Sequence, residues 1–161
     1  MSLVVSRYHD ISCGHRVAGH EGKCQGLHGH NYRIHFDVAS ETGALDALGR
    51  VVDFGVIKST LCQWLEDIWD HNMLLWAQDP ILPLFAPIYK NGRTWGETPA
   101  DDLAASAIRD SLCVVPFNPT AENMAEFLLN TVGPSLLTEH GLKLTRVRIE
   151  ETRKCSATAS L

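Results

Sequence analysis

One stretch of the sequence, from His28 to Val38, constrains the fold more than any other. It reads HGHNYRIHFDV, and from Tyr32 onward the even positions are aromatic or aliphatic while the odd positions are polar. Alternation with a period of two is typical of a β-strand with one buried face. If the strand begins by residue 28, His28 and His30 share the face of the apolar side chains. The pattern therefore predicts a strand over residues 28–39 that directs two imidazoles into one partly apolar site.

Two converging imidazoles are typical of a zinc site, and the third ligand is the open question. A catalytic zinc ion takes three protein ligands and leaves its fourth position open, whereas a structural site closes all four. His15 follows an expected first strand, and an antiparallel partner strand could deliver it to the same face. His20 and Cys24 compete with it, and both together with the two strand histidines would make a closed structural site. Spacing alone does not decide between these sets.

Composition limits the class of protein. A chain of 161 residues fits one domain with a sizeable core. The formal net charge of -5 argues against a general nucleic-acid binder, which needs a basic face. No apolar run approaches the roughly 20 residues of a membrane span, and no signal peptide is evident, so a cytoplasmic protein is expected. Five scattered cysteines indicate reduced thiols rather than a disulfide framework.

The rest of the chain alternates between strand and helix patterns. Apolar residues recur at helical spacing after Ile57, and a second helix is expected to begin at the N-cap Thr120 and to be interrupted at Gly133-Pro134. This order predicts an α+β fold, in which an antiparallel four-stranded sheet carries two helices on one face. The expected elements are strands 3–13 and 28–39, helices 57–68 and 120–132, and strands 142–152 and 154–161.

Six short motifs resemble those of the 6-pyruvoyltetrahydropterin synthase family. They are His15-Arg16, Cys24-x-x-x-His28-Gly29-His30-Asn31-Tyr32, Val52-Asp53-Phe54-Gly55, Asp70-His71-Asn72, Pro119-Thr120-Ala121-Glu122-Asn123 and Glu151-Thr152. Each motif alone is weak, but the six together cover nearly the whole chain in the family's order. The resemblance implies the tunnelling fold, or T-fold. It also implies a homo-oligomer in which sheets from several subunits close a barrel, expected here as a hexamer-type assembly of trimers.

The resemblance implies a role for each matching residue and so selects among the possible ligands. The metal would be Zn²⁺, and His20 would have no ligand role. The zinc ligands would be His15, His28 and His30. Among the catalytic residues, Cys24 would be the base that takes a proton, His71 with Asp70 would be a proton relay, and Glu151 would hold the pterin ring and complete that relay. Thr120 and Glu122 would be further substrate contacts.

The implied substrate, 7,8-dihydroneopterin triphosphate, suits these residue types. A zinc ion can acidify a C–H bond beside the side-chain oxygens that it binds, and a thiolate near the metal can take the proton. A carboxylate at Glu151 matches the paired N–H donors of the pterin edge. The family's two reactions differ in their end point, which is either 6-pyruvoyltetrahydropterin or, after C–C cleavage, a 6-carboxy product and acetaldehyde. The three residues between Cys24 and His28 favour the bacterial, carboxy-forming branch, which feeds 7-deazaguanine and queuosine synthesis. The alternatives are the pyruvoyl-forming reaction and a non-enzymatic, zinc-stabilised binding module.

Residues 77–117 depart from the family pattern as an insertion within a single domain, residues 1–161. The segment includes a brief strand-like run at residues 112–115. The aromatic residues in and beside the segment, Trp76, Phe85, Tyr89 and Trp95, are more than a solvated linker would carry. We therefore expect the insertion to border the pterin site, with a surface or subunit contact as the alternative.

Overall fold

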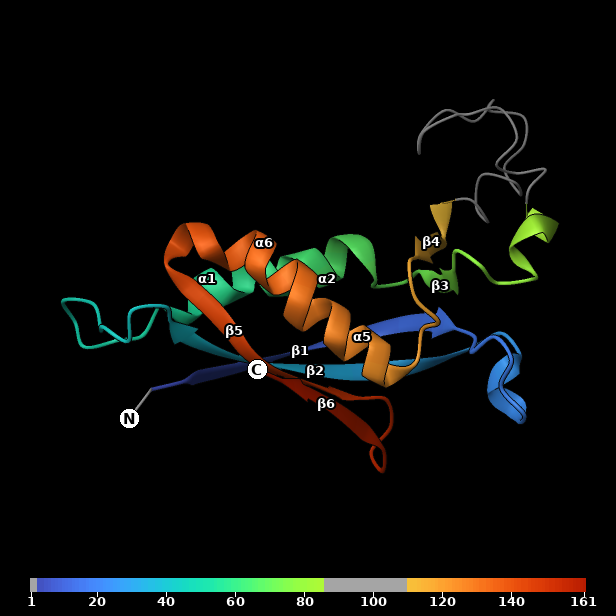
Figure 1. Cartoon of the computed structure of the whole chain (residues 1–161), viewed down its shortest axis with the longest axis horizontal. Helices are drawn as coiled ribbons and strands as arrows, with labels where there is room; N and C mark the ends of the chain where they lie inside the picture. The colour runs from blue at the N-terminus through green and yellow to red at the C-terminus, as the bar shows by residue number, and fades with distance from the viewer. Residues whose placement is uncertain (1–2, 86–109) are drawn as a thin grey trace.

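A six-stranded sheet is the framework of the protein (Figure 1). The computed structural model describes residues 3–85 and 110–161. Its strands are β1 (Val5–His15), β2 (His28–Ser40), β3 (Met73–Trp76), β4 (Leu112–Val115), β5 (Leu142–Glu150) and β6 (Ser156–Ser160). Neighbouring strands follow the order β4-β3-β1-β2-β5-β6. The four longer strands pair antiparallel as predicted, whereas β3 and β4 run parallel to β1.

The prediction of an antiparallel four-stranded sheet is therefore wrong, because the sheet is mixed and has two further strands. Each of these strands is only four residues long, and although the run at residues 112–115 is predicted to be strand-like, so short a segment does not indicate that it joins the sheet. The position of β3 is set by the turn before it, which bonds to the edge of β1. The His71 amide donates to the Ser12 carbonyl at 2.7 Å, and the Gly14 amide donates to the Asn72 carbonyl at 2.9 Å. Tertiary contacts of this kind leave no pattern in the sequence.

Two helices cover one face of the sheet, as predicted (Figure 1). The first runs through α1 (Phe54–Ile57), a π-turn (Lys58–Cys62) and α2 (Gln63–Ile68). The second runs through α5 (Ala121–Phe127), a π-turn (Leu128–Val132) and α6 (Gly133–Leu137). Short 3₁₀ turns lie at Lys23–Gln25, Leu82–Phe85 and Thr138–His140. Within the described residues, no helix combines the length and apolar character that crossing a bilayer requires.

The second helix continues through Gly133 and Pro134, where an interruption was predicted. Proline lacks an N–H and normally disturbs a helix interior. Here the preceding turn is widened, because the Gly133 N–H bonds to the Leu128 carbonyl five residues back. A Cβ atom at Gly133 would lie 2.7 Å from the side chain of Leu144 on β5. Glycine at this position therefore permits close packing of the helix on the sheet and does not end the helix.

The hydrophobic core lies between the sheet and these helices. Tyr32, Ile34, Phe36 and Val38, which alternate along β2, are all fully buried. They pack with apolar side chains of both helices. The strand and the buried face predicted from the alternation are thus confirmed. The same face carries the even-numbered histidines at the start of β2.

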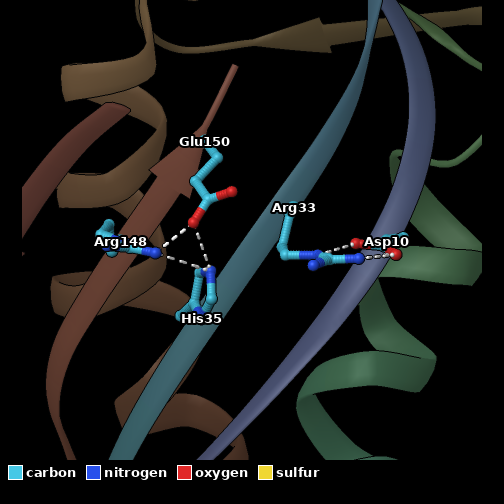
Figure 2. Close-up of polar contacts among 5 residues, drawn as sticks. All are labelled: Asp10, Arg33, His35, Arg148 and Glu150. Carbon is cyan, nitrogen blue, oxygen red and sulfur yellow. Dashed lines mark hydrogen bonds and ion pairs between the residues drawn. The ribbon is translucent and has the colours of Figure 1, made fainter. Parts of the chain in front are cut away.

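The other face of the sheet is polar and carries two groups of ion-paired side chains (Figure 2). Arg33 donates two hydrogen bonds to Asp10 across β1 and β2, at 2.7 and 2.8 Å. His35 lies 2.9 Å from Glu150, and Arg148 contacts both of these residues. The sheet is therefore amphipathic, with the core on one face and paired charges on the open face.

The expected insertion at residues 77–117 is described in part. Its strand-like run at residues 112–115 forms β4, as predicted. Residues 86–109 lie outside the described residues, and they include Tyr89 and Trp95. The hypothesis that the insertion borders the pterin site therefore stays a prediction.

Candidate metal centre

Three histidines converge where β1 and β2 join. His15 is the last residue of β1 and pairs directly with His28, the first residue of β2. His30 follows on the same face of β2, opposite Cys13. The ring centroid of His15 lies 4.4 Å from that of His28 and 5.2 Å from that of His30. One ligand atom from each histidine lies within 4.8 Å of the others, so the register of the hairpin builds the group.

The hydrogen bonds of two of these rings fix their tautomers. Nδ1 of His15 lies 2.7 Å from the Pro119 carbonyl oxygen, and Nδ1 of His28 lies 2.8 Å from that of Gly26. A carbonyl oxygen only accepts, so each Nδ1 carries the hydrogen and each Nε2 keeps a lone pair. Nε2 of His15, of His28 and of His30 is buried and has no hydrogen-bond partner. Three converging Nε2 atoms without hydrogen-bond partners are the arrangement that a metal cation satisfies.

Electrostatics favour the neutral imidazoles that metal binding needs. Burial lowers the pKa of His15, against the opposing effect of its hydrogen bond to Pro119. Burial likewise lowers the pKa of His30, against the opposing charge of Glu151. Both shifts reduce the proton's competition for the ring nitrogens. The three histidines could therefore hold a metal ion of the kind that imidazole ligands suit.

The closed four-ligand alternative is not formed. Nδ1 of His20 accepts a hydrogen bond from the Gly22 amide at 2.8 Å. In residues 3–85 and 110–161, the three histidines are the only group of potential ligands close enough to share an ion, and neither His20 nor Cys24 belongs to it. Cys24 lies half-buried in the 3₁₀ turn between β1 and β2. The pairing of the two strands thus brings His15, and neither His20 nor Cys24, to the two strand histidines.

Glu151 lies beside the histidines at the end of β5. Its Oε1 is 3.5 Å from Nε2 of His15 and 3.7 Å from Nε2 of His30. The Tyr32 hydroxyl donates to the same oxygen at 3.5 Å. A half-buried carboxylate in this position can accept hydrogen bonds from a bound molecule next to the metal. The carboxylate that the family resemblance assigns to the pterin ring thus lies next to two of the three histidines.

Residues 118–123 hold the histidine group in place. The Asn118 side chain accepts from the Ala18 amide and donates to the Ala18 carbonyl, both at 2.9 Å. Asn123 in turn donates to the Asn118 carbonyl at 2.8 Å. Together with the Pro119 carbonyl that orients His15, these bonds fix the segment that follows His15. The sequence analysis missed this role of Asn118, because its partner lies one hundred residues earlier in the chain.

The two predicted substrate contacts at the start of α5 are placed differently. The Thr120 hydroxyl accepts from the Asn123 amide at 3.2 Å and so caps the helix. Glu122 is exposed in the first helical turn, and none of its described interactions reaches the histidines. Their contacts with substrate stay predictions.

Asp70 and His71 do not join the histidine group within one chain. Asp70 accepts from His71 Nδ1 at 2.7 Å and from the Ser12 amide at 2.8 Å. Partial burial alone would raise the pKa of Asp70, but these hydrogen bonds outweigh it and lower that pKa. His71 has a φ of 59° and its side chain is 83% exposed. The pair lines a cavity of about 610 Å³ with Asp10 and Arg33, on the open face of the sheet.

Fold and site together define an α+β protein with a potential three-histidine metal centre at the end of its sheet. Comparison with known proteins identifies the family. The sequence profile described as 6-pyruvoyl tetrahydropterin synthase matches residues 4–160. The chain belongs to this family.

Relatives and solved structures agree with this assignment. The chain is 32% identical over 146 residues to 6-carboxy-5,6,7,8-tetrahydropterin synthase of Rickettsia typhi, with 91% of each protein covered. It is 28% identical to the Haemophilus influenzae protein of the same name, with 92% of each covered. A Wolinella succinogenes protein of unknown function superposes with a TM-score of 0.80 at 25% identity, covering 99% of both chains. Caenorhabditis elegans 6-pyruvoyl tetrahydropterin synthase shares the fold, with a TM-score of 0.60 at 20% identity and 99% and 95% coverage.

Proposed function

We propose that the protein is a zinc-dependent carbon–carbon lyase. Its reaction would convert 7,8-dihydroneopterin triphosphate and water to 6-carboxy-5,6,7,8-tetrahydropterin, acetaldehyde and triphosphate, a step toward 7-deazaguanine and queuosine. The observation that carries the proposal is the convergence of three unpartnered, buried Nε2 atoms beside Glu151. The names of the relatives that match about nine-tenths of the chain support the same reaction.

The residues divide the work between holding the metal and binding the pterin. His15, His28 and His30 would hold the zinc ion, which when bound supplies a Lewis acid to the side-chain oxygens of the substrate. Glu151 accepts hydrogen bonds from the N–H donors of the pterin edge, next to the metal ligands. Cys24, in the turn between the two ligand-bearing strands, takes the proton from the substrate side chain.

His71 and Asp70 return the proton, and we infer that they come from a second copy of the chain. The cavity that both residues line lies on the open face, whereas the three histidines share the helix-covered face, although His71 also lines a second cavity that His30 borders. Asp70 keeps one imidazole nitrogen protonated, so the other nitrogen of His71 can exchange a proton with substrate.

Two free sheet edges support assembly of several copies. Only Gly14 and His15 of β1 meet β3, so the earlier part of β1 has no neighbouring strand on that side among the described residues. β6 likewise has a strand on one side only. Pairing of a β1 edge with a β6 edge of the next copy is a head-to-tail contact, which forms a ring when the rotation between copies closes. We propose a homo-oligomer on this basis, with a hexamer-type assembly of trimers as the expected form.

The test is product analysis by mass spectrometry after incubation of the zinc-loaded protein with 7,8-dihydroneopterin triphosphate. We expect the carboxy product with acetaldehyde. His28→Ala should be inactive. His20→Ala is the matched control and should be active, because His20 lies between the same two strands but is not one of the three proposed ligands. A 6-pyruvoyl product would replace the lyase with the triphosphate-eliminating reaction. An absence of turnover in the zinc-loaded protein would leave a non-enzymatic, metal-stabilised module.

A further inference from the structure

The cavity on the open face is lined by several charged side chains besides His71. Its volume is about 610 Å³, and its walls include Asp10, Arg33, Asp70, His71, Glu150 and Arg153. These side chains come from β1, β2, the turn before β3, and the end of β5 with the turn that follows. The charges of these side chains decide which kind of molecule the cavity would bind.

Each acidic group in the walls already has a partner. Asp10 receives both hydrogen bonds of the Arg33 guanidinium, and Glu150 is contacted by His35 and by Arg148 outside the cavity wall (Figure 2). Asp70 accepts from His71 and from the Ser12 amide. The carboxylates of Asp10 and Glu150 are therefore paired with guanidinium groups, and that of Asp70 is engaged by two hydrogen bonds within the protein.

Arg153 differs from these residues, because its side chain has no ion pair or hydrogen bond among the described residues. It is exposed, in the turn between β5 and β6. The Thr152 hydroxyl accepts from the amides of Lys154 and Cys155, both at 3.1 Å, so the backbone that carries Arg153 is well held. A guanidinium that has no carboxylate partner suits an oxyanion, and phosphate groups match its paired donors.

We propose that this cavity binds the triphosphate group of the substrate and that Arg153 is a guanidinium that binds it. The proposal rests on the proposed function and extends it to the triphosphate. If His71 acts on the substrate side chain, that side chain reaches one of the two cavities that His71 lines, and of these two only the open-face cavity has an arginine in its walls. The triphosphate is attached to the same short side chain and must lie close by. The chain has a formal net charge of -5, so a multiply charged anion needs a local cation of this kind.

The direct test is binding of inorganic triphosphate, measured by isothermal titration calorimetry with the zinc-loaded protein. Arg153→Ala should weaken binding by roughly tenfold to a hundredfold, since it removes a charge-assisted hydrogen bond. Arg153→Lys should recover part of the affinity. Lys154→Ala removes a neighbouring charge that does not line the cavity and should change binding less than about twofold. In turnover assays, Arg153→Ala should raise the KM for 7,8-dihydroneopterin triphosphate, while zinc content and inhibition by phosphate-free 7,8-dihydroneopterin stay at wild-type values.

Failure of this inference differs from failure of the proposed function. If the wild type does not bind inorganic triphosphate, or if Arg153→Ala and Lys154→Ala bind it equally, the inference is overturned even when the enzyme is active. If triphosphate binding depends on Arg153 but the pterin is not converted, the anion site stands and the proposed reaction falls.

Discussion

Metal removal should lower the thermal stability of the protein without unfolding it. Nε2 of His15, of His28 and of His30 is buried without a partner, and an unsatisfied buried polar atom costs about 1–3 kcal/mol. A bound metal ion satisfies all three atoms, and it binds the folded state alone because the unfolded chain does not bring these residues together. The fold has its own core, so the metal-free protein should still be folded at room temperature.

The size of the effect follows from mass action. Free zinc at one hundred times its dissociation constant stabilises the folded state by about 2.7 kcal/mol. For a chain of this length, that increment raises the Tm by about 5–11 °C. The assay is a thermal melt followed by circular dichroism, before and after chelation and after zinc is restored at that ratio.

Two variants make the assay specific. His15→Ala should melt at the same temperature with and without zinc, because one of the three ligands is missing. His20→Ala should keep the full response, because His20 is outside the group. A wild-type Tm that does not respond to zinc, or an equal response in His15→Ala, would refute the assignment of the metal centre.

Three further predictions concern the surroundings of the site. Glu151→Gln should weaken 7,8-dihydroneopterin binding at least tenfold in titration, because an amide replaces the charged acceptor, while zinc affinity stays within about twofold of the wild-type value. Equal pterin affinity in the two proteins would count against a role of Glu151 in pterin binding. Asp79→Ala should lower the free energy of unfolding in urea by about 3–5 kcal/mol, because it leaves the Arg16 guanidinium, which lies 3.0 Å from this buried carboxylate, without its partner. A change below about 1 kcal/mol would show that the two residues do not form a structural ion pair. Burial raises the pKa of Cys13 to about 12 and that of Cys113 to about 11. Both thiols should therefore resist iodoacetamide at pH 8 in the folded protein and react after denaturation. Rapid labelling of either cysteine in the native state, measured by peptide mass mapping, would contradict their burial.

The sequence predicted the parts of the fold that depend on local periodicity. Alternation from Tyr32 to Val38 identified the central strand and its buried face, because one side chain in two must enter the core. Helical spacing identified the two helices on one face. The interruption expected at Gly133 was wrong, because the glycine serves packing against Leu144 and the widened turn before it accommodates the proline.

The parts that depend on distant contacts could not be read from the sequence. Strand alternation brought His28 and His30 together, but the choice of His15 needed the register of the first two strands. The bonds between Asn118 and Ala18 join segments one hundred residues apart and follow no period. The placement of His71 on the open face depends on a turn that bonds to the edge of β1.

The most direct test of the account is subunit complementation between the two halves of the proposed site. His28→Ala removes a metal ligand and leaves the Asp70–His71 pair intact, whereas His71→Ala does the opposite. Each variant alone should release no acetaldehyde from 7,8-dihydroneopterin triphosphate. Mixed oligomers are formed by refolding the two variants together and are verified by native mass spectrometry. They should recover roughly a quarter of wild-type activity, because random mixing pairs an intact histidine group with an intact His71 at that frequency. Verified mixed oligomers that release no acetaldehyde, or a His71→Ala protein with full activity, would contradict the account.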